Sequence, residues 1–187
     1  MRRRELETTL RAAGKVARDL EFFLIGSQAL HAVSRRAPAE VLLSQECDIY
    51  PKNRPETANL LHNELGPNSA FARRHGFYAD VVTPDLATLP SGWKRRVKPL
   101  RTGRVTAFCL DLYDLIVSKL VAARLKDLEL IGALLRLGLA DHKLIQRRIT
   151  KIPSSPERGR LRLRLRLLLK EVRSGNRSVI RTKGPPE

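Results

Sequence analysis

Residues 22–51 constrain the fold of this chain more than any other stretch, because they predict a strand, a tight turn, a helix and a second strand in succession. The first strand is Phe22–Ile25, four apolar residues that are followed by Gly26 and Ser27. Such a pattern is typical of a buried strand that runs into the start of a helix. We expect Ser27 to cap a helix over Gln28–Arg36, and Gly26 to permit a close approach of the backbone.

The second strand of this unit, expected over Val41–Tyr50 after a break at Pro38, carries two acids. Because side chains alternate along a strand, Glu46 and Asp48 point to the same face. Two adjacent carboxylates repel each other unless a cation or water lies between them. A Mg²⁺ ion that binds one or two carboxylates and the phosphates of a substrate meets this need, so the stretch predicts a metal-dependent phosphate site.

The charge of the chain points to a polyanionic partner. Among 187 residues, 36 Lys and Arg stand against 19 Asp and Glu, which gives a net charge of +17. From Arg158 to the end there are ten basic residues and two acids, so the remainder of the chain is basic as well. Such a balance favours nucleic acid or an anionic membrane surface as a partner. The hydrophobic fraction of 42% is ordinary for a globular domain with one core.

The cysteines and the N-terminus indicate a cytoplasmic protein without a membrane segment. Cys47 and Cys109 have neither metal-ligand nor disulfide-scaffold spacing, so we interpret them as buried thiols. The basic residues Arg2–Arg4 lead straight to Glu5, with no apolar core of a secretory signal. No apolar run approaches the ~20 residues that a membrane-spanning helix needs.

Hydrophobic periodicity and breaker residues predict the remaining elements. A turn near residues 125–127 is expected to divide the longest helix, and Asp141 to cap the last one. We expect helices over 5–21, 56–65, 111–137 and 142–150, strands over 77–82 and 105–110, and an exposed basic loop or hairpin edge over 89–100. These elements suggest one domain over residues 1–152, helical from about 111, and a basic tail over 153–187.

The tail contains a strict alternation of Arg and Leu over Arg160–Leu167. Alone, this pattern predicts a strand with one basic face. Arg and Leu are also good helix formers, so a helix remains open, as does a poorly ordered, solvated tail. In functional terms the segment suits an electrostatic arm for RNA or DNA.

The order of Gly26-Ser27 followed by Glu46-x-Asp48 resembles the nucleotidyltransferase superfamily that contains the DNA polymerase beta-like and minimal nucleotidyltransferases. Within it the chain looks most like the bacterial AbiEii-like families, many of them toxins of toxin–antitoxin pairs. Residues 112–120 and 124–129 resemble their helical block D-L-x-x-x-K-L … R-x-K-D. The resemblance implies an α/β (α+β) fold, with a small mixed sheet flanked by helices and a C-terminal helical region.

The resemblance also implies roles for individual residues. Mg²⁺ (or Mn²⁺) would be held by Glu46 and Asp48, with Asp80 as the candidate third carboxylate, and Gly26 with Ser27 would bind the triphosphate. Glu46 stands where the superfamily usually has Asp. In related families a lysine on the long helix contacts the triphosphate and an Asp shortly after it assists.

Two residues of the helical block match this lysine and this Asp. Lys119 lies amid apolar residues, where an unpaired lysine is costly. Asp127 follows in the block, so Glu46, Asp48, Lys119 and Asp127 are the expected catalytic residues. The alternative is that Lys119 reaches the surface and that Asp127 forms a solvated pair with Lys126 or Arg124.

A basic stretch is the expected nucleic-acid contact: Trp93, Lys94, Arg95 and Arg96 could grip a phosphate backbone and stack a base. The alternative is an ordinary solvated face. We therefore expect transfer of a nucleoside monophosphate from an NTP to an RNA acceptor such as tRNA, with an antitoxin as a protein partner. A non-catalytic nucleic-acid-binding protein on the same scaffold is the competing hypothesis. A protein or small-molecule acceptor, such as an aminoglycoside, also remains open.

Overall fold

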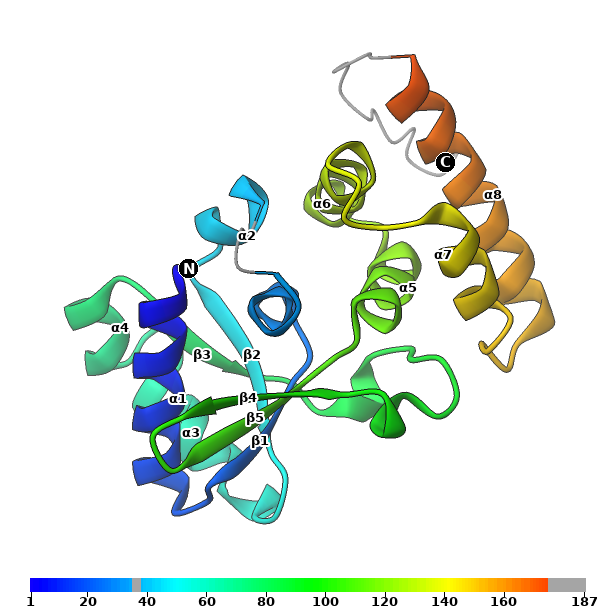
Figure 1. Ribbon diagram of the computed structural model, residues 1–187. Coiled ribbons are helices and arrows are strands. Elements are labelled where there is room, and N and C mark those ends of the chain that lie inside the picture. Colours follow the sequence, from blue (N-terminus) through cyan, green and yellow to red (C-terminus); the bar gives the residue numbers. More distant parts are fainter. Residues whose placement is uncertain (35–37, 175–187) are drawn as a thin grey trace, which may run out of the picture.

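A five-stranded mixed sheet forms the centre of the molecule, as the computed structural model in Figure 1 shows. The structure describes residues 1–34 and 38–174. The strand order is β3-β2-β1-β5-β4, in which β1 pairs in parallel with β5 and β2 with β3, and the other pairs are antiparallel. The strands are β1 (Glu21–Leu24), β2 (Glu46–Pro51), β3 (Tyr78–Val81), β4 (Lys98–Thr102) and β5 (Val105–Cys109). The expected α/β class with a small mixed sheet is confirmed.

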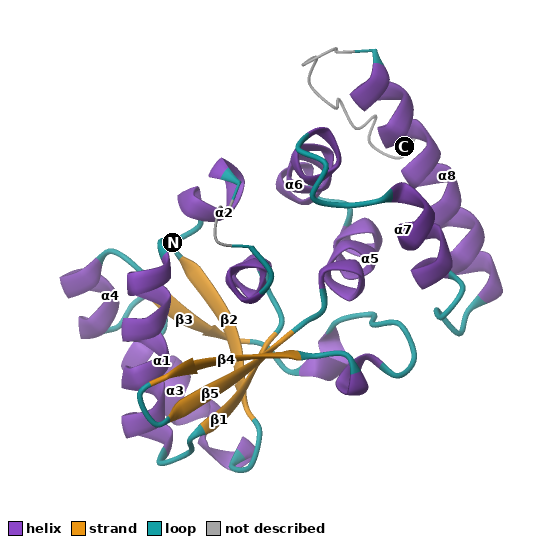
Figure 2. Cartoon of the chain, in the orientation of Figure 1, coloured by secondary structure: helices purple, strands orange, loops and turns teal. Residues whose placement is uncertain are grey.

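Helices cover both faces of this sheet and extend beyond it (Figure 2). Two of them, α1 and α3, pack together against the strands, while a 3₁₀ helix, η1, packs on the strands and against α5. Beyond α5, the helices α6, α7 and α8 form the C-terminal helical part (Figure 1). The α-helices are α1 (Arg3–Ala17), α2 (Ala39–Leu43), α3 (Ala58–Leu65), α4 (Ala70–His75), α5 (Leu112–Ala122), α6 (Leu125–Arg136), α7 (His142–Ile149) and α8 (Ser155–Arg173). The 3₁₀ helices are η1 (Ser27–Ala32), η2 (Pro55–Thr57), η3 (Pro84–Leu86) and η4 (Trp93–Arg95).

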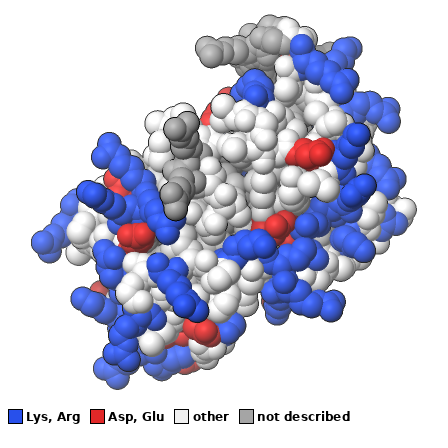
Figure 3. Space-filling view, viewed as in Figure 1, with Lys and Arg blue, Asp and Glu red and all other residues white. Residues whose placement is uncertain are grey.

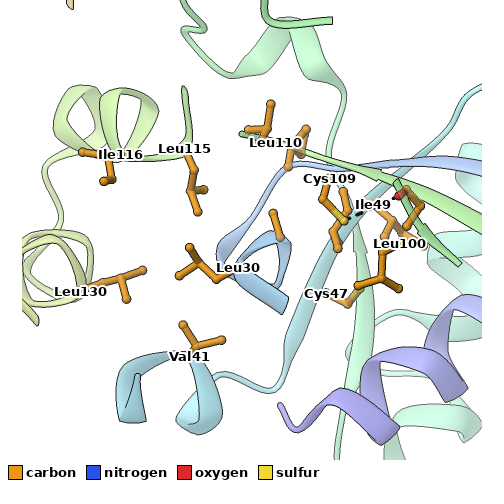
Figure 4. Close-up of a cluster of buried hydrophobic side chains, with 14 of the residues drawn as sticks. Leu30, Val41, Cys47, Ile49, Leu100, Cys109, Leu110, Leu115, Ile116 and Leu130 are labelled. Atoms are coloured by element: carbon orange, nitrogen blue, oxygen red, sulfur yellow. Dashed lines mark hydrogen bonds between the residues drawn. The ribbon is translucent and has the colours of Figure 1, made fainter. Parts of the chain in front are cut away.

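One continuous core joins the sheet to the C-terminal helices. Figure 4 shows Leu30 of η1 and Val41 of α2 together with Leu115 of α5 and Leu130 of α6, all of them buried. The expected buried thiols are confirmed, since Cys47 and Cys109 are both free and buried. Because this core extends from the strands to α6, it holds the strand ends and the long helices in a defined relative position.

The second strand is shorter than the sequence predicts. It begins at Glu46, and residues 39–43 form the short helix α2 instead of strand. Only Val41 of α2 is buried, whereas Leu43 is 81% exposed. The carbonyls of Val41 and Leu42 accept hydrogen bonds from the amino group of Met1, at 2.9 and 2.7 Å. A contact across forty residues thus satisfies the helix end, and no local pattern could reveal it.

The helix after Gly26 also differs from its prediction. It is the 3₁₀ helix η1, its N-cap is Gly26, and Ser27 is its first residue instead of its cap. The prediction extended this helix to Arg36, and residues 35–37 lie outside the described part of the chain. The predicted break in the long helix is present, but it lies at Ala123, which adopts a left-handed conformation, whereas residues 125–127 form the first turn of α6. Asp141 caps α7 through the Lys143 amide, as predicted.

The Arg/Leu alternation forms a helix, α8, so the strand interpretation is wrong. The cap is Ser154, and a proline in the first turn favours the helix start. Leu161, Leu165 and Leu168 are buried, because a helical spacing brings these leucines onto one stripe. The remaining leucines of the alternation, Leu163 and Leu167, are 55% and 54% exposed. The division expected at residue 152 falls in the turn between α7 and α8. Among the described residues, no helix is long and apolar enough to cross a bilayer.

Candidate functional site

The turn after β1 lies directly against an acid of β2. A Cβ atom built on Gly26 would stand 1.4 Å from Oδ2 of Asp48, so any other residue at position 26 would overlap with this carboxylate. The backbone amide of Ile25 donates to the carbonyl of Asp48 at 3.0 Å, which holds the two segments together. The close approach that the sequence predicted for Gly26 is therefore an approach to Asp48.

The acids of β2 share one face, and the neighbouring strand adds a third. Glu46 and Asp48 are half-buried on one side of β2, while Cys47 and Ile49 are buried on the other. In the parallel register Asp48 pairs with Asp80 of β3, so these two side chains leave the sheet on the same face. Burial and the negative charge of Glu46 raise the pKa of Asp48 to about 6, and Lys119 only partly offsets this.

An ion-pair network around the buried carboxylate of Asp127 joins α5 to the start of α6, and the Arg124 side chain in it is 62% exposed. The Nζ atom of Lys119 donates to Asp127 Oδ1 at 2.6 Å, and Nε of Arg124 donates to Oδ2 at 2.8 Å. The Asp127 side chain is fully buried and that of Lys119 is 14% exposed. Burial alone would raise the pKa of Asp127, but the hydrogen bonds from Arg124 and Lys119 outweigh this and lower it. The pair of Asp127 with Arg124, which the alternative named, is thus formed, but its carboxylate is buried and also binds Lys119.

A further lysine connects the helical part to β2. Nζ of Lys126 donates to Oε1 of Glu46 at 2.8 Å, and this bond raises the pKa of Lys126. Both side chains are accessible, at 57% for Lys126 and 28% for Glu46. The sequence predicted Lys126 only as a partner of Asp127. Nothing in the local sequence indicates this bond, because Glu46 and Lys126 are 80 positions apart and only the fold brings them together.

Two adjacent hollows lie between the strand ends and the helices α5 and α6, and we call them together the cleft. They have volumes of about 260 and 370 Å³, and both are lined by Ser27, Glu46 and Lys119. The smaller hollow is also lined by Gly26, Asp48, Ser118 and Arg124, and the larger one by Tyr78, Lys126 and Asp127. Thus Gly26, Ser27, Glu46, Asp48, Lys119 and Asp127, distant in sequence, meet in one cleft. Ser118 and Arg124 join them without having been predicted, and Asp80 lines neither hollow.

The carboxylates of the cleft offer part of the ligand set of a divalent ion. Among the residues that the structure describes, no group of three or more His, Cys, Asp or Glu side chains is arranged to hold a metal. Glu46 and Asp48 still offer hard oxygen donors on one face, which is the ligand type that Mg²⁺ prefers. The Asp48 carboxylate lies against Gly26 and is repelled by the negative charge of Glu46. A cation bound between the two carboxylates would offset this repulsion. This pair fits a divalent ion when Lys126 releases Glu46.

The predicted nucleic-acid contact is divided by the fold. Trp93 packs edge-on against Phe23, with ring centroids 5.3 Å apart. Arg96 donates twice to the buried carboxylate of Asp114, each bond at 2.9 Å. Lys94 and Arg95 are exposed. Nucleic-acid binding by this stretch stays a prediction, and the exposed pair is the part of it that a partner can reach.

The comparison with known families agrees with this cleft. Residues 4–164 match a family profile that is described as "Nucleotidyltransferase of unknown function (DUF6036)". The match includes every element that lines the cleft. No significant match is found among curated proteins or among solved structures. The predicted relationship to nucleotidyltransferases is confirmed at this general level.

Proposed function

The chain belongs to this family of nucleotidyltransferases, and from that premise we propose that it transfers a nucleoside monophosphate from an NTP to an RNA acceptor in a Mg²⁺- or Mn²⁺-dependent reaction. The observation that carries the proposal is the meeting of Gly26-Ser27, the Glu46/Asp48 pair and Lys119 in one cleft. Each group has the chemistry that one part of a nucleoside triphosphate complex requires. The hollow between α7 and α8, by contrast, is lined by Lys, Arg, Gln, Thr and Leu and by neither an acid nor a serine.

The triphosphate is assigned to the smaller hollow. Its lining offers the Ser27 hydroxyl, the Lys119 ammonium and the Arg124 guanidinium to phosphate oxygens. Asp127 binds both cations, so it holds them in place before a triphosphate arrives. Such preorganisation lowers the cost of ordering two long side chains on binding.

The reaction itself is a displacement at the α-phosphate. The acceptor hydroxyl oxygen bonds to the α-phosphorus, the bond from that phosphorus to the pyrophosphate oxygen breaks, and the hydroxyl proton is released to solvent. A divalent ion held by Glu46 and Asp48, with Asp80 as the proposed further ligand, would supply charge stabilisation at the phosphate. Lys119 and Arg124 would stabilise the charge on the leaving pyrophosphate.

The net charge of +17 supports an RNA acceptor, since a polyanion gains from a basic surface. The resemblance of the Leu112–Leu120 block to AbiEii-like proteins supports tRNA as the acceptor, a toxin role in a toxin–antitoxin pair and an antitoxin partner. We propose the cytoplasm as the place of action on the same basis.

Incubation with α-labelled NTPs, Mg²⁺ or Mn²⁺ and total RNA tests the proposal. We expect the wild-type protein to label RNA, and Glu46→Ala and Asp48→Ala to abolish the labelling. Asp85→Asn is the matched control, because Asp85 is an exposed acid that lines neither hollow of the cleft. Full labelling by both alanine variants would refute the assignment.

One observation favours the competing function, a non-catalytic nucleic-acid-binding protein. Lys126 occupies an oxygen of Glu46 that a metal ion would need. This function predicts salt-dependent RNA binding that requires neither a triphosphate nor Mg²⁺. A triphosphate-dependent increase in melting temperature that disappears in Lys119→Ala would exclude it, because such a change requires a nucleotide site in the cleft.

A further inference from the structure

A third hollow lies between α7 and α8, and we call it the α7–α8 groove. Its volume is about 490 Å³, and it is lined by Lys143, Gln146, Arg147, Thr150, Arg162, Arg166 and Leu169. Four of these side chains are cationic and none is acidic. Figure 3 shows Lys and Arg gathered on the surface formed by α7 and α8, with few acids among them. The groove is therefore a concentrated positive site outside the cleft.

The groove cations differ from their neighbours in lacking a partner within the part of the chain that the structure describes. Among the described residues, Lys143, Arg147, Arg162 and Arg166 form no side-chain hydrogen bond or ion pair. Neighbouring arginines on the same helices, by contrast, have partners within the protein. Arg148 pairs with Asp111 and Asp114, Arg160 pairs with Glu157, and Arg164 donates to the carbonyls of Leu120 and Val121. Contacts within the protein therefore give those arginines a structural role. No such contact among the described residues gives the four groove cations a structural role.

The spacing of the groove cations suits a phosphate backbone. Lys143 and Arg147 are four residues apart on α7, as are Arg162 and Arg166 on α8, so each pair lies on one helix face about 6 Å apart along the axis. Like charges at this spacing repel each other, and an anion between them removes the repulsion. Two such pairs facing one hollow can contact several phosphates of a single strand.

The polar side chains in the groove favour RNA over DNA. Gln146 of α7 and Thr150, which caps the C-terminus of α7, also line it, four residues apart. The Thr150 hydroxyl donates to the carbonyl of Arg147 at 2.8 Å, which leaves its lone pairs available to accept a hydrogen bond. The 2′-hydroxyl of RNA both donates and accepts, and DNA lacks it. An amide and a hydroxyl between rows of cations can therefore recognise ribose.

We propose that the α7–α8 groove binds a single-stranded RNA segment, with Lys143, Arg147, Arg162 and Arg166 contacting its phosphates. The proposal rests on the proposed function only where it identifies this RNA with the acceptor. The groove and the cleft are held together through α8, because Arg164 binds the carbonyl of Val121, a residue that lines the smaller hollow of the cleft. An RNA bound in the groove is thereby placed on the same rigid helices as the triphosphate site.

Salt-dependent RNA binding tests the groove without any catalytic step. The fluorescence anisotropy of a short labelled single-stranded RNA is measured over a salt series, without NTP or divalent ions. With four phosphate contacts, the affinity of the wild-type protein should fall about 50-fold between 50 and 200 mM salt, and that of Arg162→Gln/Arg166→Gln only about 7-fold. Lys15→Gln/Arg74→Gln removes the same charge from exposed positions on α1 and α4 and should follow the wild type. An unchanged salt dependence in the groove variant overturns the proposal.

Three further arms identify the ligand. Single-stranded DNA of the same sequence should bind more weakly than the RNA. Gln146→Leu should reduce the difference between the affinities for RNA and for DNA. Vesicles that contain phosphatidylserine should not compete for the RNA. Equal binding of DNA, or displacement of the RNA by vesicles, overturns the assignment to RNA.

The groove and the proposed function can fail separately. If RNA is labelled by the wild-type protein but the groove variant binds RNA normally, the groove proposal fails and the function stands. If no RNA is labelled but the groove variant loses RNA binding, the groove stands and the function fails. If both hold, the groove variant should raise KM for RNA and leave KM for the NTP unchanged.

Discussion

The cations of the cleft and those of the α7–α8 groove have opposite surroundings. In the cleft, Lys119 and Arg124 bind Asp127, and Lys126 binds Glu46. In the groove, none of the four cationic side chains has an acidic partner among the described residues. Carboxylates hold the cleft cations at defined positions, whereas the groove cations keep their full charge for an external anion.

This difference suits the cleft cations to hold a ligand in a defined position, and the groove cations to attract one. A triphosphate that reacts must be held with its α-phosphate in line, so ordered cations are an advantage there. A polymer that only docks gains more from uncompensated charge, which attracts it over a distance and tolerates many sequences. The same residue types therefore serve two purposes, and the partner of each side chain distinguishes them.

The largest expected effect is on the reaction in the cleft. Asp48→Asn should lower nucleotidyl transfer by about 10²–10³-fold, since removing a group that stabilises the developing charge of a reaction has effects of this order. Initial rates of labelled NMP transfer at saturating NTP measure this. The groove variant Arg162→Gln/Arg166→Gln should keep its rate at saturating RNA. Equal losses in the two variants would break the distinction between the cleft and the groove.

The next effect concerns the buried carboxylate that binds Lys119 and Arg124. Asp127→Ala should reduce the free energy of unfolding by about 3–5 kcal/mol, because it leaves a buried cation without its partner. Urea denaturation measures this loss. Asp114→Ala is the matched control, since Asp114 is also fully buried and binds Arg96 and Arg148.

Both variants should lose stability, but only Asp127→Ala should also weaken triphosphate binding by the folded protein. Normal triphosphate binding in Asp127→Ala would show that Asp127 supports the fold alone. The groove variant should change the free energy of unfolding by no more than about 0.5 kcal/mol, as expected of an exposed substitution.

The raised pKa of Asp48 predicts a pH dependence of stability. Its pKa is about 6 in the folded protein against an ordinary value of 3.8, so between these values the folded state retains a proton that the unfolded state has released. Stability should therefore fall as the pH rises through this range, by no more than about 3 kcal/mol. Urea denaturation of the wild type and of Asp48→Asn at several pH values measures the difference. The free energy of unfolding of Asp48→Asn relative to the wild type should increase with pH up to about pH 6 and then stay constant. A difference that does not change with pH would contradict the raised pKa of Asp48.

A smaller effect is expected at the turn beside Asp48. Gly26→Ala places a methyl group on the Asp48 carboxylate and should cost about 1–3 kcal/mol of stability together with activity. Gly159→Ala is its counterpart on α8, where an added Cβ meets no atom within 4 Å. This control should gain about 0.5–1 kcal/mol, because alanine suits a helix better than glycine. Thermal melts of both proteins compare the two sites, and a harmless Gly26→Ala would refute the close approach.

The smallest effect belongs to the accessible pair of Lys126 and Glu46. Lys126→Gln should change the free energy of unfolding by less than about 1 kcal/mol, since exposed ion pairs contribute little. It should instead tighten Mn²⁺ binding, because it releases the Glu46 carboxylate. Titration calorimetry with Mn²⁺ measures this, with Lys94→Gln as a control of equal charge at an exposed site. Weaker Mn²⁺ binding in Lys126→Gln would contradict the proposed competition.

Much of the cleft could be predicted because its residues belong to short local patterns. Gly26-Ser27 after an apolar strand and Glu46-x-Asp48 on the next strand follow from strand periodicity and turn chemistry. Lys119 was predicted because a lysine among apolar neighbours needs an anion or a route to solvent. The structure supplies that anion as Asp127.

Other features could not be predicted because distant contacts decide them. The apolar run Val41–Leu43 suits a strand, yet the amino group of Met1 satisfies the end of a short helix there. Arg96 looked like a nucleic-acid contact, but Asp114 on α5 binds its guanidinium. Lys126 gave no sign of its bond to Glu46, a residue 80 positions away.

The sequence by itself determined which chemical groups are present, the order of the strand-turn-strand unit and the excess of positive charge, because composition and short-range periodicity are local properties. Only the tertiary structure decided which cations are neutralised and which remain free. Two arginines in equivalent local sequence, Arg162 and Arg164, differ in that one faces the groove and the other binds carbonyls of α5. The reason is that residues two positions apart on a helix point to different faces. The element that packs against each face therefore sets the role of each charge.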